Sequence, residues 1–302
     1  MTAQVVLFHY GPFQPLWQRP GMIQCGPGLV AGETSLPVAV CEVRAIQQAL
    51  TSRGRSTAAV LLHYTDPFLI RAAPLRSLRR WRGPRLLVCG DLHHGPAPID
   101  TLEAYLDKEF HDAVLLAFNP MLLTEVQARL AVPVHCHPPG FFRYPRCHRH
   151  PQPARRLVHV GSLGSHHPQR RALVQTLQER GRIPFLHCTT TSAEQAAELY
   201  AANSLVLNVP LNNDLNHRFY EVMAAGAPQI VFGSPVLLGP LQDLAHRSDL
   251  HWVEQVEELE ALVQNLLASP ERLQRPVEPP PELDLHQLLR RVFGASITHT
   301  LA

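Results

Sequence analysis

The sequence predicts an α/β protein built from two doubly wound domains whose parallel sheets face each other across a cleft. Three observations predict this class. Short aliphatic runs alternate with helix-like stretches through most of the 302 residues, which indicates parallel strands joined by right-handed crossovers. A stretch without apolar periodicity divides the runs into two series. A proline-rich segment near the end precedes one more amphipathic helix.

The first domain is predicted over residues 1–150. Its expected strands are short aliphatic runs separated by enough chain for a crossover helix. They are Val5–Phe8, Ala58–Leu62, Arg85–Cys89, Ala113–Ala117 and Val132–His135. Between Cys136 and Arg156 the chain becomes a mixture of proline, histidine and arginine, which is typical of a linker.

The second domain is predicted over residues 151–281. Its expected strands are Leu157–Val160, Ile183–His187, Ser204–Val209 and Pro228–Phe232. The proline cluster at 276–281 favours a stiff, extended spacer. After it, Leu285, Leu288, Leu289, Val292 and Phe293 recur at helical spacing. We expect this helix, within residues 282–302, to cross back to the first domain.

The composition limits the function classes. A hydrophobic content of 45% is enough for a core in each domain. No apolar run approaches the roughly 20 residues that span a bilayer, and the N-terminus lacks the charged flank of a signal peptide, so we expect a cytoplasmic protein. The six cysteines lack the spacing of a zinc site or a disulfide framework. A net charge of +2 is too small to imply a nucleic-acid partner.

One local basic cluster stands out against this weak net charge. It contains Arg76, Arg79, Arg80, Arg82 and Arg85. Its simplest interpretation is a solvated helix and turn. The alternative is a docking surface for an acidic partner or for an anionic membrane.

The most informative stretch of the chain runs from Asn212 to Pro228. It follows the aliphatic run Ser204–Val209, so the pattern predicts a strand, a polar loop and a short helix that ends at Gly226. In open parallel sheets, loops at the carboxyl ends of strands bind small molecules. A helix N-terminus there also offers free N–H groups to an anion.

Three side chains at the start of this helix, His217, Arg218 and Glu221, have the chemistry of a nucleotide site. A carboxylate can hold a ribose diol, while a neighbouring cation and the helix end hold phosphate. The plain alternative is that Glu221 is a first-turn acid favoured by the helix dipole.

Several segments of the second half carry a family resemblance. Leu157–Leu163 and Arg170–Leu173 match a strand, its glycine turn and the following helix, Tyr200–Asn208 matches a helix and strand, and Asn212–Gly226 matches a longer motif. Together they resemble the nucleotide-binding domain of GT-B glycosyltransferases, in particular the spore-maturation CgeB-like group of family-1-type glycosyltransferases. In the first half, Cys89–Gly95 resembles the Asp-x-His-His-Gly segment of the acceptor domain.

The resemblance implies metal-independent transfer of a sugar from a UDP- or GDP-linked donor to an acceptor hydroxyl on a glycan, a protein or a small molecule. It implies that Glu221 binds the ribose and Arg218 the diphosphate. The donor site implied in this way consists of Gly161, Ser162, Asn213, Asn216, His217, Arg218 and Glu221. Glycine at 161 would let the phosphates approach the backbone.

One position departs from the resemblance. Retaining GT-B enzymes often carry a second glutamate eight residues before the ribose-binding one, and here that position is Asn213. An amide bonds sugar hydroxyls but does not stabilise positive charge at the anomeric carbon, so the stereochemical outcome stays open.

Candidate catalytic residues follow the strand Arg85–Cys89. They are Asp91, His93 and His94. A histidine oriented by Asp91 would be the base for the acceptor hydroxyl, or it would only contact the sugar or serve the structure. A non-catalytic nucleotide-sugar or protein-binding module is the main alternative function. A GT-B-fold epimerase or phosphorylase is a further alternative. The phosphorylase is disfavoured, since its cofactor requires a lysine and the only lysine is Lys108.

Overall fold

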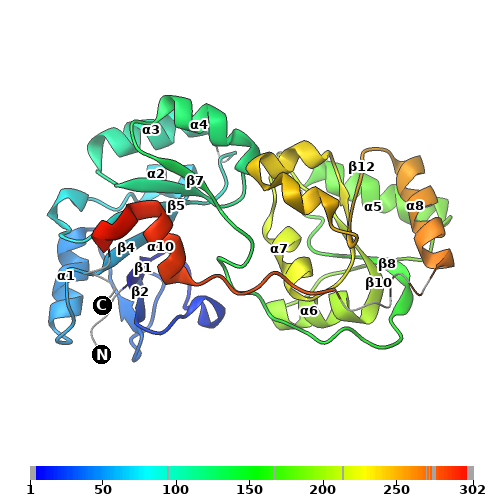
Figure 1. The fold of residues 1–302 in the computed structure, drawn as a ribbon, viewed down its shortest axis with the longest axis horizontal. Helices are drawn as coiled ribbons and strands as arrows, with labels where there is room; N and C mark the ends of the chain where they lie inside the picture. Colours follow the sequence, from blue (N-terminus) through cyan, green and yellow to red (C-terminus); the bar gives the residue numbers. More distant parts are fainter. Residues whose placement is uncertain are drawn as a thin grey trace. The chain divides into compact units, whose positions relative to one another are not determined.

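The computed structural model describes residues 5–93, 95–165, 167–212, 214–269, 271, 273 and 277–297. It confirms the predicted α/β class with two parallel sheets, one in each of two compact units (Figure 1). One unit comprises Met1–His137 and Leu283–Ala302, and the other comprises Pro138–Glu282. The division at His137 falls inside the stretch expected to be a linker.

The first unit holds a seven-stranded sheet in the order β3-β2-β1-β4-β5-β6-β7, with every pair parallel. Its strands are β1 (Val5–Phe8), β2 (Met22–Gly26), β3 (Ser35–Pro37), β4 (Val60–Thr65), β5 (Arg85–Cys89), β6 (Ala113–Leu116) and β7 (Val134–Cys136). Val5 pairs with Met22 on one side and with Val60 on the other. The order therefore reverses at β1, because the chain leaves toward β2 and returns on the far side as β4.

Helices cover this sheet and complete its core. They are α1 (Val43–Thr51), α2 (Pro67–Ala72), α3 (Pro98–Lys108), α4 (Leu123–Arg129) and α10 (Leu285–Phe293), with 3-10 turns η1 (Pro15–Trp17), η2 (Leu78–Arg80), η3 (Pro120–Leu122) and η5 (Gly294–Ile297). Ile46 of α1 and Leu102 of α3 pack against Phe8 of β1 and its neighbours. Leu289 of α10 is fully buried, and Figure 1 draws this helix in red within the first unit. The predicted C-terminal helix therefore belongs to the first unit.

The second unit holds a five-stranded parallel sheet in the order β12-β11-β10-β8-β9. Its strands are β8 (Ala154–Val160), β9 (Phe185–Cys188), β10 (Asn203–Asn208), β11 (Gln229–Phe232) and β12 (Leu250–Val253). Its helices are α5 (Pro168–Arg180), α6 (Ala193–Ala202), α7 (His217–Ala224) and α8 (Val256–Ala268), with the 3-10 segment η4 (Pro235–His246). The strand order reverses between β8 and β10.

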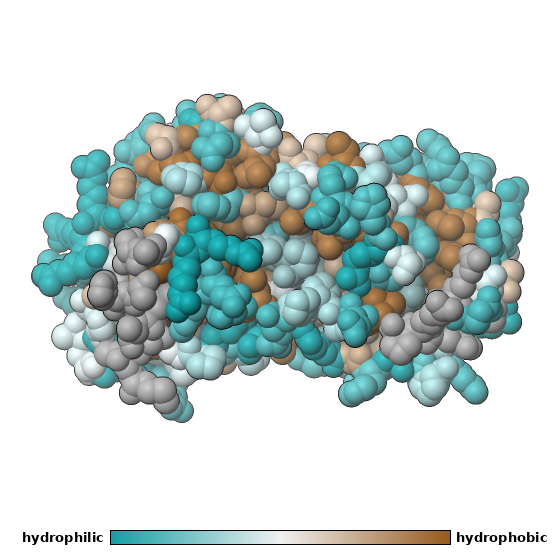
Figure 2. Space-filling view, in the orientation of Figure 1, coloured by the Kyte–Doolittle hydropathy of each residue, from teal (hydrophilic) through white to brown (hydrophobic). Residues whose placement is uncertain are grey.

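Alternate side chains of this sheet feed two different cores. Leu157 and Leu205 pack with α5 and α8 on one face. Val158 and Val206 pack with α6 and α7 on the other face. The second unit is therefore a three-layer sandwich of helices, sheet and helices. In the space-filling view of the chain, hydrophilic residues cover much of the visible surface (Figure 2). Among the described residues, no helix has the length and apolar content needed to cross a membrane.

A buried histidine pair in the first unit couples its stability to pH. The Nδ1 of His63 lies 3.2 Å from the Nε2 of His111, and the Nδ1 of His111 donates to the Glu109 carbonyl at 3.0 Å. Burial lowers the pKa of His111 to about 4, and burial together with His111 lowers the pKa of His63 well below its usual value. Both rings are therefore neutral in the folded protein near neutral pH.

We predict that the first unit loses stability as the pH falls. Each histidine has a lower pKa in the folded protein than in the unfolded chain, where its pKa is near 6.5. Its contribution to the stability of the fold is therefore fully present above pH 6.5. That contribution is lost as the pH falls from there toward 4, because the unfolded chain takes up protons first, at up to about 1.4 kcal/mol per pH unit for each ring. Denaturant unfolding from pH 7.5 to 4.5 measures the slope. His63→Phe should flatten it, and an unchanged slope in that variant would contradict this origin.

Candidate functional site

The site predicted in the second unit lies at the point where the strand order reverses. Loops leave the carboxyl ends of β8 and β10 there, beginning at Gly161 and at Val209. Ligands of open α/β sheets bind at such a reversal because the two loops separate and leave a crevice. Beside it, a hollow of about 400 Å³ is lined by Gln169, Leu173, Val209, Pro210, Phe232, Gly233 and Glu254.

Gly161 and Arg218, both predicted for this site, lie against each other. Gly161 has a φ of +148°, and a Cβ atom on it would lie 2.0 Å from Nη2 of Arg218. Only glycine fits, both for its backbone angle and because the guanidinium occupies the space of a side chain. The amide of Gly161 donates to the Cys188 carbonyl at 2.9 Å, which fixes the turn. The first turn of α7 thus places a cation directly on the backbone of the glycine turn.

Glu221 is held on the same helix by a tyrosine that sequence reasoning had not assigned to the site. The hydroxyl of Tyr200, a buried residue of α6, donates to Oε2 of Glu221 at 3.2 Å. Burial raises the pKa of Glu221, while Arg218 and the Tyr200 hydroxyl oppose that rise. Arg218, Tyr200 and Glu221 therefore form one polar cluster between α6 and α7.

Asn216 and His217 have structural partners of their own. Asn216 caps α7, since its Oδ1 accepts from the Phe219 amide at 3.2 Å. The Nδ1 of His217 lies 2.7 Å from the Tyr144 hydroxyl, and its ring packs on Phe142. Burial lowers the pKa of His217 to about 4, so the ring is neutral. The cap and the neutral ring fix where α7 begins.

The remaining predicted donor residues belong to the two loops. The Oγ of Ser162 accepts from the Gly164 amide at 3.1 Å and so shapes the loop after β8. In the loop after β10, Oδ1 of the buried Asp214 accepts from the Leu211 amide at 3.0 Å. Asn213, also predicted for the site, lies outside the described residues.

Arg170 joins the site although sequence reasoning gave it only a place in a helix. It is 7% exposed and donates from Nη2 to the Val209 carbonyl at 3.0 Å. Burial lowers its pKa to about 10, with Arg218 adding to the effect and Asp214 opposing it. Two guanidinium groups thus lie near one another, and Asp214 lies close enough to Arg170 to oppose the effect of burial. An arginine in the first turn of the helix after a glycine turn was the only sequence signal for it.

His159, in β8, lies under the same loops. Its ring stacks on His187 with centroids 5.8 Å apart, and its Nδ1 donates to the Leu207 carbonyl at 3.0 Å. Burial lowers its pKa to about 3, and Arg218 adds to this effect. A neutral imidazole therefore lies close to Arg218 and Arg170, which both lower its pKa.

Several buried polar atoms around this reversal have no hydrogen-bond partner among the described residues. They are Nε of Arg170, Nε of Arg218, Nε2 of His159, and both Oδ1 and Nδ2 of Asn208. Asn208 is the last residue of β10. Because Val206 pairs with Val158, the Asn208 residue two positions later lies near Val160, the last residue of β8. A buried polar atom without a partner costs about 1–3 kcal/mol. The N–H groups of Arg170, Arg218 and Asn208 among them can donate to a polar anionic ligand, while Nε2 of His159 and Oδ1 of Asn208 can only accept.

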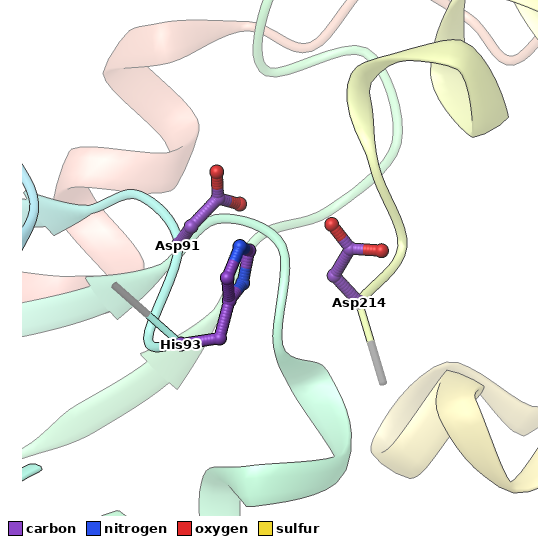
Figure 3. A group of neighbouring side chains, drawn as sticks. All are labelled: Asp91, His93 and Asp214. Atoms are coloured by element: carbon purple, nitrogen blue, oxygen red, sulfur yellow. The ribbon is translucent and has the colours of Figure 1, made fainter. Parts of the chain in front are cut away.

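In the first unit, Asp91 and His93 lie on the loop after β5 (Figure 3). The Gly90 amide donates to the Thr65 carbonyl at 2.7 Å, and the Leu92 amide donates to Oδ1 of the buried Asn119 at 2.8 Å. Burial and then the charge of Asp91 raise the pKa of Tyr64 in the adjacent strand. The loop is thus anchored at the carboxyl edge of the first sheet. His94 lies outside the described residues.

A family model described as glycosyl transferase-like matches residues 148–278. No curated protein sequence matches the chain. The second unit, which carries Arg170 and Arg218, therefore contains a glycosyl transferase-like domain.

Solved structures show the fold. Sucrose-phosphate synthase from Thermosynechococcus elongatus is 15% identical at a TM-score of 0.53, over 97% of this chain and 90% of that one. TarM is 8% identical at a TM-score of 0.49, over 78% of this chain and 52% of TarM. A mutant of S. aureus TarM in complex with fondaparinux, alpha-GlcNAc-glycerol and UDP is 9% identical at 0.49, over 86% and 57%. The chain has the GT-B fold, which the likeness to sucrose-phosphate synthase supports. It spans about half the length of TarM.

Proposed function

We propose that this protein is a glycosyltransferase that binds a nucleotide-diphosphate sugar at the carboxyl edge of the second sheet and transfers the sugar to an acceptor hydroxyl. The glycosyl transferase-like match over residues 148–278 supports the reaction class. The cluster of buried, unpartnered polar atoms around Arg170 and Arg218 is the observation that carries the position of the donor.

The proposed donor site separates the two ends of the nucleotide. Arg218 and Arg170 neutralise the diphosphate, which must leave with its negative charge when the glycosidic bond breaks. The glycine turn at 161 brings backbone amides within reach of the same phosphates. Glu221, held by Tyr200, binds the ribose hydroxyls. Because two guanidinium groups supply the positive charge, we propose transfer that is independent of a metal, which an unchanged turnover after EDTA treatment would support.

The donor class is tested by thermal unfolding of the full chain with uridine, guanosine, thymidine and adenosine diphosphates and their sugars. A ligand at 100 times its Kd stabilises a folded protein by about 2.7 kcal/mol, which is readily measured. We expect the diphosphate and the diphosphate sugar of one nucleoside, uridine or guanosine, to raise the Tm. No shift with any of these ligands would overturn the proposal.

A hydrolysis assay with the donor that binds then separates an enzyme from a binding module. An enzyme releases sugar slowly to water when no acceptor is present. Binding with no hydrolysis and no transfer to any acceptor would favour the non-catalytic module.

His93 and Asp91 are proposed to act on the acceptor. A positioned general base contributes about 10²–10⁴-fold to a rate. We therefore predict that His93→Gln lowers kcat by at least 100-fold and changes the Kd of the donor by less than threefold. Steady-state kinetics and calorimetry on the same variant provide both values. Unchanged kcat would remove this loop from the reaction.

A further inference from the structure

A basic surface lies at the amino edge of the first sheet, where the chain enters β4 and β5. Arg53 follows α1 on the way to β4, and Arg79, Arg80 and Arg82 precede β5. The two segments are joined by contacts. The indole of Trp81 donates to the Ala59 carbonyl at 2.8 Å, and Gly83 packs so closely on that carbonyl that a Cβ there would lie 2.1 Å from it. Folding thus brings the chain segment that follows Arg53 against the segment that carries Arg79, Arg80 and Arg82.

These arginines have little neutralising charge around them. All four are exposed, and none forms a salt bridge within the described residues. Residues 67–90 contain six arginines and no aspartate or glutamate. Of the nearby acids, Asp112 pairs with Arg85 at 3.0 Å and Glu109 accepts from the Leu78 amide at 2.9 Å. Glu33 is exposed in the loop before β3.

Two exposed apolar side chains lie in segments that contact arginines of this region. Val30 is 82% exposed, and its loop is tied to Arg53, which donates to the Gly32 carbonyl. Phe110 is 43% exposed, and the Arg85 guanidinium lies 4.5 Å from the centre of its ring. An apolar side chain in water is usually unremarkable alone. Here each of the two lies in a segment that contacts an arginine of this region.

The proposed transfer uses none of these residues. The amino ends of β4 and β5 are opposite the carboxyl edge, where Asp91 and His93 lie. The arginines are also too exposed to stabilise the fold appreciably. Any function of this surface is therefore separate from donor and acceptor binding.

We propose that this amino-edge surface, defined by Val30, Arg53, Arg79, Arg80, Arg82 and Phe110, binds the surface of an anionic lipid membrane. Basic residues gain about 1 kcal/mol each near such a surface, and apolar neighbours add burial in the headgroup region. The phosphates of a nucleic acid would attract the arginines, but they offer no apolar layer in which Val30 and Phe110 could be buried. The combination of charge and exposed apolar groups favours lipid.

Flotation of the full chain with vesicles tests this proposal. We expect binding to phosphatidylcholine vesicles containing 30 mol% phosphatidylglycerol, much weaker binding to pure phosphatidylcholine, and release by salt. The triple variant Arg79→Gln, Arg80→Gln, Arg82→Gln should partition about 100-fold less, since about 1 kcal/mol per arginine is about fivefold. Val30→Asp should also weaken binding, because it removes the apolar contact.

A charge-matched variant provides the control. Arg182→Gln, Arg290→Gln, Arg291→Gln removes three arginines that lie outside the amino-edge surface, so its partitioning should change by less than fivefold. Unaltered circular dichroism and Tm would show that both triple variants fold. Equal losses in the two variants would mean that only net charge matters and would overturn the proposal. Equal binding to neutral and anionic vesicles would also overturn it. So would tighter binding to duplex DNA than to the vesicles, if the Val30→Asp substitution left the DNA binding unchanged.

Discussion

Arg218→Gln is expected to weaken the binding of a nucleoside diphosphate about 100-fold and to leave the binding of the bare nucleoside within about twofold. The guanidinium lies against the glycine turn at 161, where a side chain would overlap it, and this is the turn at which the diphosphate is proposed to bind. A hydrogen bond to a charged group contributes about 1.5–3 kcal/mol, and an ion pair in a buried setting adds to it. Calorimetry with the diphosphate and the nucleoside measures both losses.

The ratio of the two losses decides the role of Arg218. Arg182→Gln, which removes an exposed guanidinium of the same unit, serves as the control and should change neither affinity. If Arg218→Gln weakens nucleoside and diphosphate equally, the side chain supports the fold of α7 and does not bind phosphate. Arg170→Gln should resemble Arg218→Gln, because the two guanidinium groups lie close enough for each charge to affect the other.

Glu221→Gln is expected to lower donor affinity by 10-fold to 100-fold through the ribose and not through the phosphates. The carboxylate is held by the Tyr200 hydroxyl at 3.2 Å and accepts hydrogen bonds that a glutamine only partly replaces. Charge-assisted hydrogen bonds are about twice as strong as neutral ones. Calorimetry with the matched ribo and 2′-deoxyribo nucleoside diphosphates measures the effect.

A thermodynamic cycle that combines the Glu221→Gln substitution with removal of the 2′-hydroxyl isolates the contact between the two groups. The wild type should prefer the ribonucleotide strongly, and the preference should nearly disappear in Glu221→Gln. A preference that survives in the variant would show that Glu221 does not contact the 2′-hydroxyl. Tyr200→Phe is a useful companion, since it removes the hydroxyl that orients the carboxylate and should give part of the same loss.

Most of the fold was predictable because its strands are continuous aliphatic runs. Arg85–Cys89 and Val5–Phe8 were predicted with the bounds that the structure shows. The strand β2 was missed because it contains Gln24, whose side chain is buried through bonds to His9 and the Gln14 backbone. Those partners are brought to it only by tertiary structure. The strands β3 and β12 were also missed, since each is short and carries polar residues.

The site was predictable where it depends on chain order and not where it depends on packing. The loop, the helix start and the acid–arginine spacing in α7 are local, so the sequence located Arg218 and Glu221 within one element. Arg170, Tyr200 and His159 reach the same place from three other elements, which periodicity does not reveal. Asn216 and His217 look like ligand residues in sequence, yet their side chains contact the Phe219 amide and Tyr144.

Amide hydrogen exchange of the full chain, with and without a saturating nucleoside diphosphate, locates the donor site without any substitution. We expect slower exchange in residues 161–165 and 214–221, the loops after β8 and β10, because bound phosphate contacts these amides and orders the start of α7. Protection confined to other segments, or none at all at saturation, would contradict a donor site at the carboxyl edge of the second sheet.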